Sequence, residues 1–410
     1  MSLIRRIPLK WRLPLIHGGL ETLSLLRGHR SHGFDAPRTP GPLVVSGFFA
    51  EALGVGRAGA LTAQALEAAG LPAIRHDLRP DFARLLDGRA TYPSLKPGGV
   101  WLQHANAPEG IVADLALGPQ RGRYRIGYWA WETSVAPAQW ARQVPKYHEI
   151  WVPSVFCAES LRASLHNNCL GDLSGRIRVM PHPLPEPQPV APDPERFGLK
   201  ASAVRALCLF DARSAFARKN PWAAIETWCT AMPNSRPNRA QLLVKCLAGD
   251  VATREGGRLR ALIARRPDIV LLTDRLSDAE MDVLVESVDF VISLHRAEGF
   301  GLSLAEAMLR GKAVVATEWS GNLDFMTLEN SALVPVTVVP VSDPSGTYRS
   351  GQWAKPNLGI AVGEIRVLLE NPARRAMLGA EARKIGPRLR APWSAESLKA
   401  LPFSTWLQQD

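Results

Sequence analysis

Two glutamates, Glu298 and Glu306, stand eight positions apart in the stretch EGFGLSLAE, with a glycine-flanked aromatic directly after the first. The preceding run VDFVISLH is typical of a buried strand, and LSLAEAMLRG is typical of a helix closed by Gly311. Glu298 is therefore predicted in the loop and Glu306 within the first two helical turns. Free N–H groups at the helix start suit a diphosphate, and a carboxylate accepts two hydrogen bonds, as from a vicinal diol. The spacing favours a nucleotide-sugar site.

Each glutamate alone also fits a plainer interpretation. Glu306 is a favourable charge near a helix N-terminus, and Glu298 is a solvated loop acid. Basic residues in FDARSAFARKNP add to the pattern, because Arg213, Arg218 and Lys219 follow a predicted strand and precede a helix. Cations at the same sheet edge would neutralise a departing diphosphate, although alone they fit a solvated basic loop.

The stretch Gly54-Val-Gly56-Arg-Ala-Gly59 matches the GxGxxG signature, a helix follows it, and Asp77 ends the next predicted strand. A NAD-binding Rossmann oxidoreductase is the alternative that this signature raises. It is disfavoured, because FFAEAL separates the strand from the glycines and the tight strand–turn–helix geometry is lost. We expect a glycine-rich loop that lets a phosphate or sugar approach the backbone, or a loop without such a role.

Short apolar runs alternate with helical patterns along the chain, which predicts α/β structure with parallel sheets. PHPLPEPQPVAPDPE holds seven prolines in fifteen residues and is typical of a linker. Two doubly wound domains would then leave a ligand-binding cleft between the carboxyl edges of their sheets. The predicted parts are a basic extension (1–40), a first Rossmann-like domain (41–185), a linker (186–202), a second Rossmann-like domain (203–385) and a C-terminal segment that packs back on the first domain (386–410).

The composition is that of a globular protein, with 410 residues, 46% hydrophobic and 21% charged. Five cysteines without CxxC spacing indicate free thiols in a reducing, cytoplasmic setting. The net charge is +11, and residues 1–40 hold seven Arg or Lys against two acids. This basic segment fits peripheral contact with the anionic inner face of a membrane, nucleic acid, or a partly ordered tail. Nucleic acid is disfavoured, since aromatic residues do not interleave with the basic ones.

The spacing of Glu298 and Glu306, together with WSGNLDFM after the helix, resembles the nucleotide-binding half of family 4 glycosyltransferases of the GT-B fold. GYWAWE and EIWVPSVF are similar to the acceptor-side domain of that family. The resemblance covers roughly residues 43–385. It implies a retaining transfer from a nucleotide sugar to a glycan or lipid-linked acceptor, as in polysaccharide biosynthesis.

The resemblance also implies roles for individual residues. Glu298 would contact the donor sugar and Glu306 the ribose, while Arg213 and Lys219 would bind the diphosphate, with Arg218 as the alternative to Arg213. His104, at the end of a first-domain strand, matches a histidine beside the reacting sugar, and it equally fits a structural histidine. The implied catalytic residues are Glu298, Arg213, Lys219 and His104, and the implied substrate-binding residues are Glu306, Gly299, Phe300, Gly301, Ser320, Gly321, Asn322, Arg218, Gly54 and Gly56.

The chain has no D-x-D pair, so we expect no metal requirement and no cofactor, with fixed cations and helix amides acting on the leaving phosphate instead. Without an identified nucleophile, retention would follow from attack on the face that the phosphate leaves. A sugar-nucleotide-binding protein without turnover is the main alternative. Trp129, Trp131 and Trp140 fit either a sugar-stacking surface or the core.

Overall fold

The chain divides into two compact units in the computed structural model. Unit 1 comprises Met1–Pro183, Ser345–Gly351 and Arg388–Asp410, and unit 2 comprises Leu184–Pro344 and Gln352–Pro387. Most of the predicted basic extension and also Arg213 lie outside the described residues. The structure describes residues 18–20, 22, 37–49, 54–86, 97–118, 122–212, 215–247 and 254–408.

Unit 1 contains a parallel sheet of six strands in the order β2-β1-β3-β4-β5-β6. Successive side chains of these strands face opposite sides of the sheet: Leu43 and Val45 pack into one core cluster and Val44 into another. Such strands read as continuous apolar runs because both faces are covered. The strand bounds are Leu43–Gly47 (β1), Ala73–Asp77 (β2), Val100–Gln103 (β3), Tyr124–Tyr128 (β4), Glu149–Val152 (β5) and Ile177–Val179 (β6).

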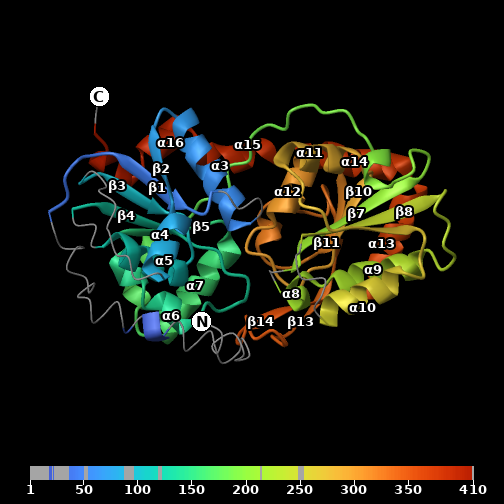
Figure 1. Ribbon diagram of the computed structural model, residues 1–410, viewed down its shortest axis with the longest axis horizontal. Helices are drawn as coiled ribbons and strands as arrows, with labels where there is room; N and C mark the ends of the chain where they lie inside the picture. The colour runs from blue at the N-terminus through green and yellow to red at the C-terminus, as the bar shows by residue number, and fades with distance from the viewer. Residues whose placement is uncertain are drawn as a thin grey trace. The chain divides into compact units, whose positions relative to one another are not determined.

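Helices cover both faces of this sheet (Figure 1). Helix α3 packs with the C-terminal segment on one face, where Trp393 stacks edge-on against Trp151 and donates its Nε1–H to the carbonyl of Pro181 at 2.6 Å. The helix bounds are Val55–Ala68 (α3), Leu78–Leu86 (α4), Ala107–Leu117 (α5), Ala138–Ala141 (α6), Val155–Asn167 (α7) and Ala395–Lys399 (α16).

Unit 2 also contains a parallel sheet of six strands, in the order β12-β11-β10-β7-β8-β9. From the centre outward the chain first builds β7, β8 and β9 on one side and then β10, β11 and β12 on the other. The strand bounds are Val204–Asp211 (β7), Ala240–Leu247 (β8), Ile269–Leu272 (β9), Phe290–Ser293 (β10), Ala313–Thr317 (β11) and Ala332–Val334 (β12).

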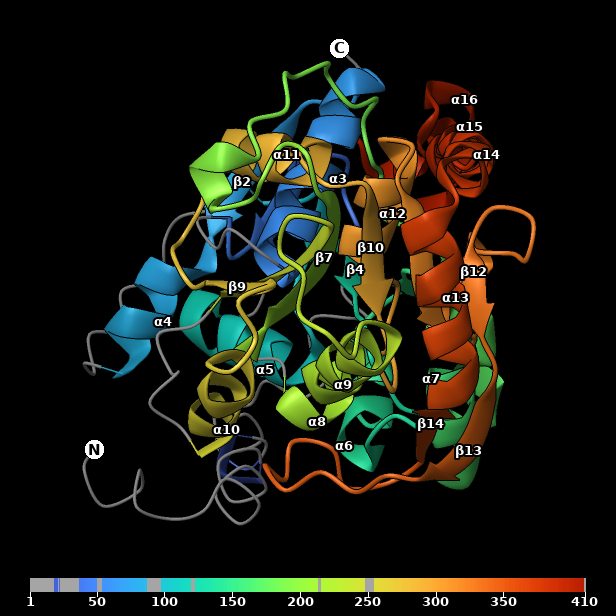
Figure 2. The ribbon, with the colours of Figure 1, turned by 90° about the vertical axis from the view of Figure 1, so that its right-hand side faces the viewer.

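Two layers of helices enclose the unit 2 sheet (Figures 1 and 2). Helices α9 and α13 pack together on one face, and α12 and α14 pack together on the other. An antiparallel hairpin, β13 (Val336–Pro340) and β14 (Gln352–Pro356), follows β12 and was not expected from the sequence. The helix bounds are Phe216–Lys219 (α8), Pro221–Ala231 (α9), Arg254–Ile263 (α10), Asp278–Glu286 (α11), Leu302–Leu309 (α12), Leu358–Glu370 (α13) and Pro372–Arg383 (α14). Helix α15 (Gly386–Arg390) begins in unit 2 and ends in unit 1.

The predicted α/β class with two parallel sheets is confirmed. The proline-rich segment has no helix before Glu195 and no strand, as its composition requires. Its end is anchored within unit 2, where the Asp193 amide donates to the Ser287 hydroxyl at 2.7 Å and Phe197 is buried. Among the described residues, no helix combines the length and the apolar character needed to cross a bilayer.

Candidate functional site

The sheet of unit 2 reverses its winding between β7 and β10, which lie side by side. Open α/β sheets bind ligands at the carboxyl ends of strands at such a switch point. Helix α8 follows β7, and Glu298 follows β10 by five residues. The basic cluster and the first glutamate, which are eighty positions apart in the sequence, therefore meet at one edge of the sheet.

A buried ion cluster forms there. The Lys219 ammonium donates to Glu298 Oε1 at 2.5 Å, and Arg218 Nη1 donates to Glu298 Oε2 at 3.1 Å and to the Ala297 carbonyl at 2.9 Å. The side chains of Arg218, Glu298 and Lys219 are 5%, 11% and 18% exposed. Lys219 is therefore the member of the cluster with the most solvent contact, whereas Arg218 is nearly enclosed.

Burial by itself would raise the pKa of the Glu298 carboxyl, but the charges of Lys219 and Arg218 outweigh it and lower the pKa to about 2. Glu298 is thus ionised at neutral pH. An ionised carboxylate accepts hydrogen bonds and donates none. The site consequently presents an acceptor and a partly accessible cation next to each other.

Local backbone geometry positions the two cations. Ala215, which precedes α8, and Asn220, which follows it, both have left-handed φ angles, of 61° and 49°. The Asn220 side chain donates from Nδ2 to the Leu294 carbonyl at 2.8 Å, and the Arg296 backbone amide donates to the Arg218 carbonyl at 2.7 Å. These bonds connect α8 to the segment that follows β10. They stabilise the unfavourable left-handed conformations of Ala215 and Asn220.

The loop that carries Glu298 is held from the other side by the segment after β11. The Ser320 hydroxyl accepts from the Glu298 amide at 2.8 Å, and the Gly321 amide donates to the Glu298 carbonyl at 2.9 Å. Ser320 and Gly321, both predicted site residues, thus lie beside Glu298. Their contacts orient the glutamate.

His295 was not singled out from the sequence. It is completely buried, and its Nε2 lies 3.1 Å from Asn322 Oδ1. Burial lowers its pKa, which the nearby Glu298 opposes. The only sequence signal was its place at the end of the strand, three positions before Glu298. It links Asn322 to β10 and so helps to hold the loop after β11.

Gly301 directly precedes helix α12 as its N-cap, and its φ of 91° lies in the left-handed region that favours glycine. A Cβ there would come within 3.3 Å of Leu304 Cδ1 and 3.4 Å of Asn322 Cβ. Phe300 is buried, with its ring 5.0 Å from the ring of Phe325. Its side chain belongs to the core, so any ligand contact at Phe300 is left to the backbone.

Glu306 is the fifth residue of α12 and is half-buried, about 6 Å along the axis from Leu302 at the helical rise. Gly299 lies in the buried loop between Glu298 and Phe300. Arg213 is outside the described residues, so its role stays a prediction.

In unit 1 the corresponding reversal falls between β1 and β3. His104 follows β3 and is buried, with its ring 4.3 Å from that of Tyr128 at the end of β4. Tyr128 in turn stacks on His182 at 5.4 Å, and its hydroxyl lies 3.0 Å from His182 Nδ1 and donates to the Met180 carbonyl at 2.6 Å. Sequence reasoning identified His104 but missed its two ring neighbours.

These two histidines are neutral. Burial lowers the pKa of His104 and of His182 to about 3. Within the described part of the chain, neither ring nitrogen of His104 has a hydrogen-bond partner. A buried polar group is normally satisfied, so the two buried and unpartnered nitrogens of His104 leave an unused hydrogen-bonding capacity at this switch point.

The glycine stretch lies beside His104. Gly54 is the residue before α3 and has a φ of 68°, Gly56 is buried in the first turn, and a Cβ on Gly59 would lie 3.4 Å from the His104 ring. Strand β1 ends at Gly47, seven residues before Gly54, so the direct strand-to-glycine turn of dinucleotide sites is absent here. Asp77, the expected ribose acceptor of that signature, accepts hydrogen bonds from Arg79 instead.

The three tryptophans considered for sugar stacking lie in a hydrophobic cluster of unit 1. Trp129 and Trp140 are buried, and their ring centroids are 5.9 Å apart. Trp131 packs on Trp140 at 5.0 Å and on Tyr348 at 5.2 Å. The core interpretation therefore holds for Trp129 and Trp140.

The family described as "Glycosyl transferases group 1" matches residues 214–346, which is less than half of the chain. This stretch contains Lys219, Glu298, Glu306 and Asn322. No curated protein matches the sequence.

Solved structures resemble most of the chain. HepE from Anabaena in complex with UDP and glucose matches with a TM-score of 0.58 and 14% identity, over 88% of this chain and 100% of that chain. Sucrose-phosphate synthase from Thermosynechococcus elongatus matches with a TM-score of 0.61 and 16% identity, over 88% and 96%. A glycosyltransferase from Rickettsia africae matches with a TM-score of 0.61 and 13% identity, over 90% and 98%. At these identities the likeness establishes the fold, and the predicted GT-B fold class is confirmed.

Proposed function

We propose that this chain is a glycosyltransferase that moves a hexose from a nucleotide-sugar donor to a hydroxyl group of a glycan or glycolipid. The observation that carries the proposal is the Lys219–Glu298–Arg218 cluster at the switch point of unit 2. The match of residues 214–346 to a glycosyltransferase family supports it. So does the likeness to HepE, whose structures hold UDP and glucose or UDP-glucose.

In this proposal the cluster acts on the donor. Glu298 accepts hydrogen bonds from hydroxyls of the donor sugar, and Glu306 does the same for the ribose. Because the pKa of Glu298 is held at about 2, Glu298 stays ionised and cannot serve as a general acid. Lys219 is the cation for the diphosphate, since its side chain is the most exposed of the three.

The chemical step needs no proton from the protein. The bond between the anomeric carbon and the phosphate oxygen breaks while the acceptor oxygen attacks from the same face, which retains the configuration. The acceptor proton passes to the departing phosphate oxygen. Lys219 and the first amides of α12 stabilise the negative charge that grows on the diphosphate, and we propose that no metal is required.

His104 contributes a neutral imidazole in this scheme. Its unpartnered ring nitrogens can form hydrogen bonds with sugar hydroxyls without adding a charge to the site. The glycine-rich start of α3, with Gly54 and Gly56, lies on the same side of unit 1 and allows the backbone to approach a ligand. The tail of residues 1–40 would bring the enzyme to an anionic membrane with a lipid-linked acceptor.

The decisive experiment incubates the full chain with a panel of nucleotide sugars and measures the release of nucleoside diphosphate. A donor that raises the thermal unfolding midpoint and is turned over, with both effects lost in the Glu298→Ala, Glu306→Ala double variant, supports the proposal. Stabilisation without turnover for every donor and acceptor would favour the alternative, a sugar-nucleotide-binding protein. Stabilisation by NAD alone would instead favour the oxidoreductase alternative.

The retention of anomeric configuration and the membrane contact are tested separately. NMR of the product reports the anomeric configuration, and inversion would reject same-face attack. Binding of the full chain and of a variant lacking residues 1–40 to anionic vesicles tests membrane contact, and equal binding would reject a role for that segment.

A further inference from the structure

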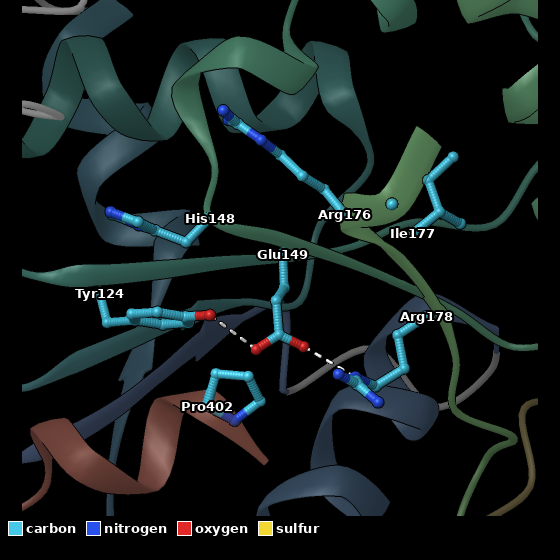
Figure 3. Close-up of a pocket in the computed structure, with 8 residues that line it drawn as sticks. Tyr124, His148, Glu149, Arg176, Ile177, Arg178 and Pro402 are labelled. Carbon is cyan, nitrogen blue, oxygen red and sulfur yellow. Dashed lines mark hydrogen bonds and ion pairs between the residues drawn. The ribbon is translucent and has the colours of Figure 1, made fainter. Parts of the chain in front are cut away.

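A pocket of about 300 Å³ lies at the amino edge of the unit 1 sheet (Figure 3). It is lined by Tyr124, the first residue of β4, and by Glu149, the first residue of β5. Tyr128, in the ring cluster with His104, is the last residue of β4 and is about 13 Å from Tyr124 at the rise of an extended strand. The pocket is therefore distinct from the candidate site at the carboxyl edge.

The carboxylate of Glu149 is already engaged on both oxygens. The Tyr124 hydroxyl donates to Oε1 at 2.8 Å, while Arg178 Nε and Trp151 Nε1 donate to Oε2 at 2.8 Å and 3.1 Å. Figure 3 shows Tyr124 and Arg178 reaching this carboxylate from opposite sides. Among the described residues that line the pocket, Glu149 is the only acid, and because its charge is already compensated by these donors it does not offer a site for a cation.

Positive charge dominates the rest of the pocket. The Arg178 side chain is 38% exposed, and only its Nε is bonded, so within the described residues its two terminal amino groups have no protein partner. Arg176 lines the pocket as well, held by a 2.7 Å bond to the Tyr147 carbonyl. Arg38 does not line the pocket: its guanidinium lies 4.8 Å over the Trp406 ring, and its charge helps to lower the pKa of the pocket residue His148.

The aromatic wall is uncharged. His148 stacks on Tyr124 at 4.6 Å, and its Nδ1 accepts from the Arg125 amide at 2.9 Å, which leaves the ring proton on Nε2. Burial, helped by the charges of Arg38 and Arg125, lowers the pKa of His148 to about 3. The wall supplies a flat surface and no further charge.

We propose that this pocket is a second ligand site, which binds a phosphate group through the free end of Arg178 with Arg176 and Arg38 as supporting charges. A guanidinium offers paired donors that match phosphate oxygens, and the pocket lining includes two arginines, Arg176 and Arg178, and one engaged carboxylate. The pocket is large enough for a small phosphorylated molecule. The same phosphate chemistry is presented by an anionic lipid headgroup, and the chain reaches Arg38 directly from its basic first segment.

Gly175 gives a variant that tests this without disturbing the fold. It lines the pocket, it is exposed, and a Cβ there would meet no atom within 4 Å. Gly175→Asp places a carboxylate at the rim, and Gly175→Asn is the neutral control of the same shape. Lys219→Ala controls for phosphate bound at the candidate donor site.

The experiment titrates inorganic phosphate into the full chain by calorimetry, and compares vesicles of phosphatidylcholine with and without phosphatidate. Phosphate binding to the wild type, to Gly175→Asn and to Lys219→Ala, weakened about ten-fold in Gly175→Asp, supports a site for a free phosphorylated ligand. Binding only to phosphatidate vesicles, weakened in the same variant alone, supports a lipid headgroup as the source. The proposal is overturned if neither probe binds, if both Gly175 variants behave alike, or if binding disappears in Lys219→Ala. Because neither the pocket nor this assay depends on donor turnover, its failure would leave the proposed transferase function standing.

Discussion

The carboxyl edges of the two sheets carry polar clusters of opposite character. In unit 2 the Glu298 carboxylate is enclosed with Lys219 and Arg218 and stays charged, with a pKa of about 2. In unit 1 the imidazoles of His104 and His182 are enclosed with Tyr128 and stay neutral, with pKa values of about 3. Burial disfavours the charged form in both places, and only the presence of countercharges separates the outcomes.

This difference suits the two edges to different kinds of ligand. A charged cluster with an accessible lysine is suited to a ligand that carries or develops charge, such as a diphosphate. A neutral ring cluster with unpartnered nitrogens is suited to hydroxyl groups, which form hydrogen bonds without requiring a desolvated ion. Four experiments test this contrast.

The largest effect is expected from Lys219→Ala. If Lys219 stabilises the leaving diphosphate, its loss should lower kcat/KM for nucleotide-sugar turnover by about 10²–10³-fold. Release of nucleoside diphosphate is the measurement. Lys200→Ala is the control, because Lys200 is exposed and contacts Asn238 in a different part of unit 2. Equal losses in both variants would remove the special role of Lys219.

Glu298→Gln should lower the free energy of unfolding at neutral pH by about 3 kcal/mol, since the pKa of this group is 4.5 when unperturbed and about 2 in the fold. A carboxyl group whose pKa is lower in the folded state than in the unfolded chain stabilises the fold at pH values above its unperturbed pKa. This stabilisation is lost as the pH falls towards the pKa of the folded state. The difference in the free energy of unfolding between wild type and Glu298→Gln should therefore decrease below pH 4.5. Denaturant unfolding measures this difference. Glu370→Gln is the control, because Glu370 forms an exposed ion pair with Arg239. A gap that does not change with pH would contradict the electrostatic explanation.

His104→Phe should change a different pH window. A buried neutral histidine with a pKa of about 3 loses stabilisation as pH falls below its ordinary value of 6.5. Phenylalanine keeps a ring on Tyr128 without a titrating group, so the acid-induced loss of stability between pH 6.5 and about 5 should shrink by about 2 kcal/mol. The exposed His166→Phe is the control. Identical pH profiles for wild type and His104→Phe would show that this imidazole is not held neutral.

The smallest effect is expected from Gly301→Ala. The left-handed φ of 91° and the close approach to Leu304 and Asn322 should cost about 1–2 kcal/mol of stability. Gly363→Ala, within α13 and with no atom near its Cβ position, should instead stabilise by about 0.5–1 kcal/mol. Thermal unfolding compares them. Two variants of equal stability would mean that the start of α12 is not strained.

Much of the arrangement of strands and helices could be predicted from the sequence. Apolar runs such as VDFVISLH and PLVVSGFF gave strands β10 and β1, because a strand covered on both faces must be apolar throughout. The hairpin β13–β14 was missed, since β13 has no buried residue and the longest buried run of β14 is the pair Trp353 and Ala354. His295, Tyr128 and His182 were missed for another reason: their partners are distant in sequence or belong to a different strand.

By itself, the sequence determined the alternation of strands and helices, the glycine that precedes α12 and the positions of the ionisable residues, since hydrophobic period, φ preference and residue type are properties of short segments. It did not determine which cation meets which acid. Strand order decided this: only the adjacency of β7 and β10 brings Lys219 and Arg218 onto Glu298. Tertiary structure likewise kept His104 neutral, because the desolvation that sets its pKa comes from everything packed around it.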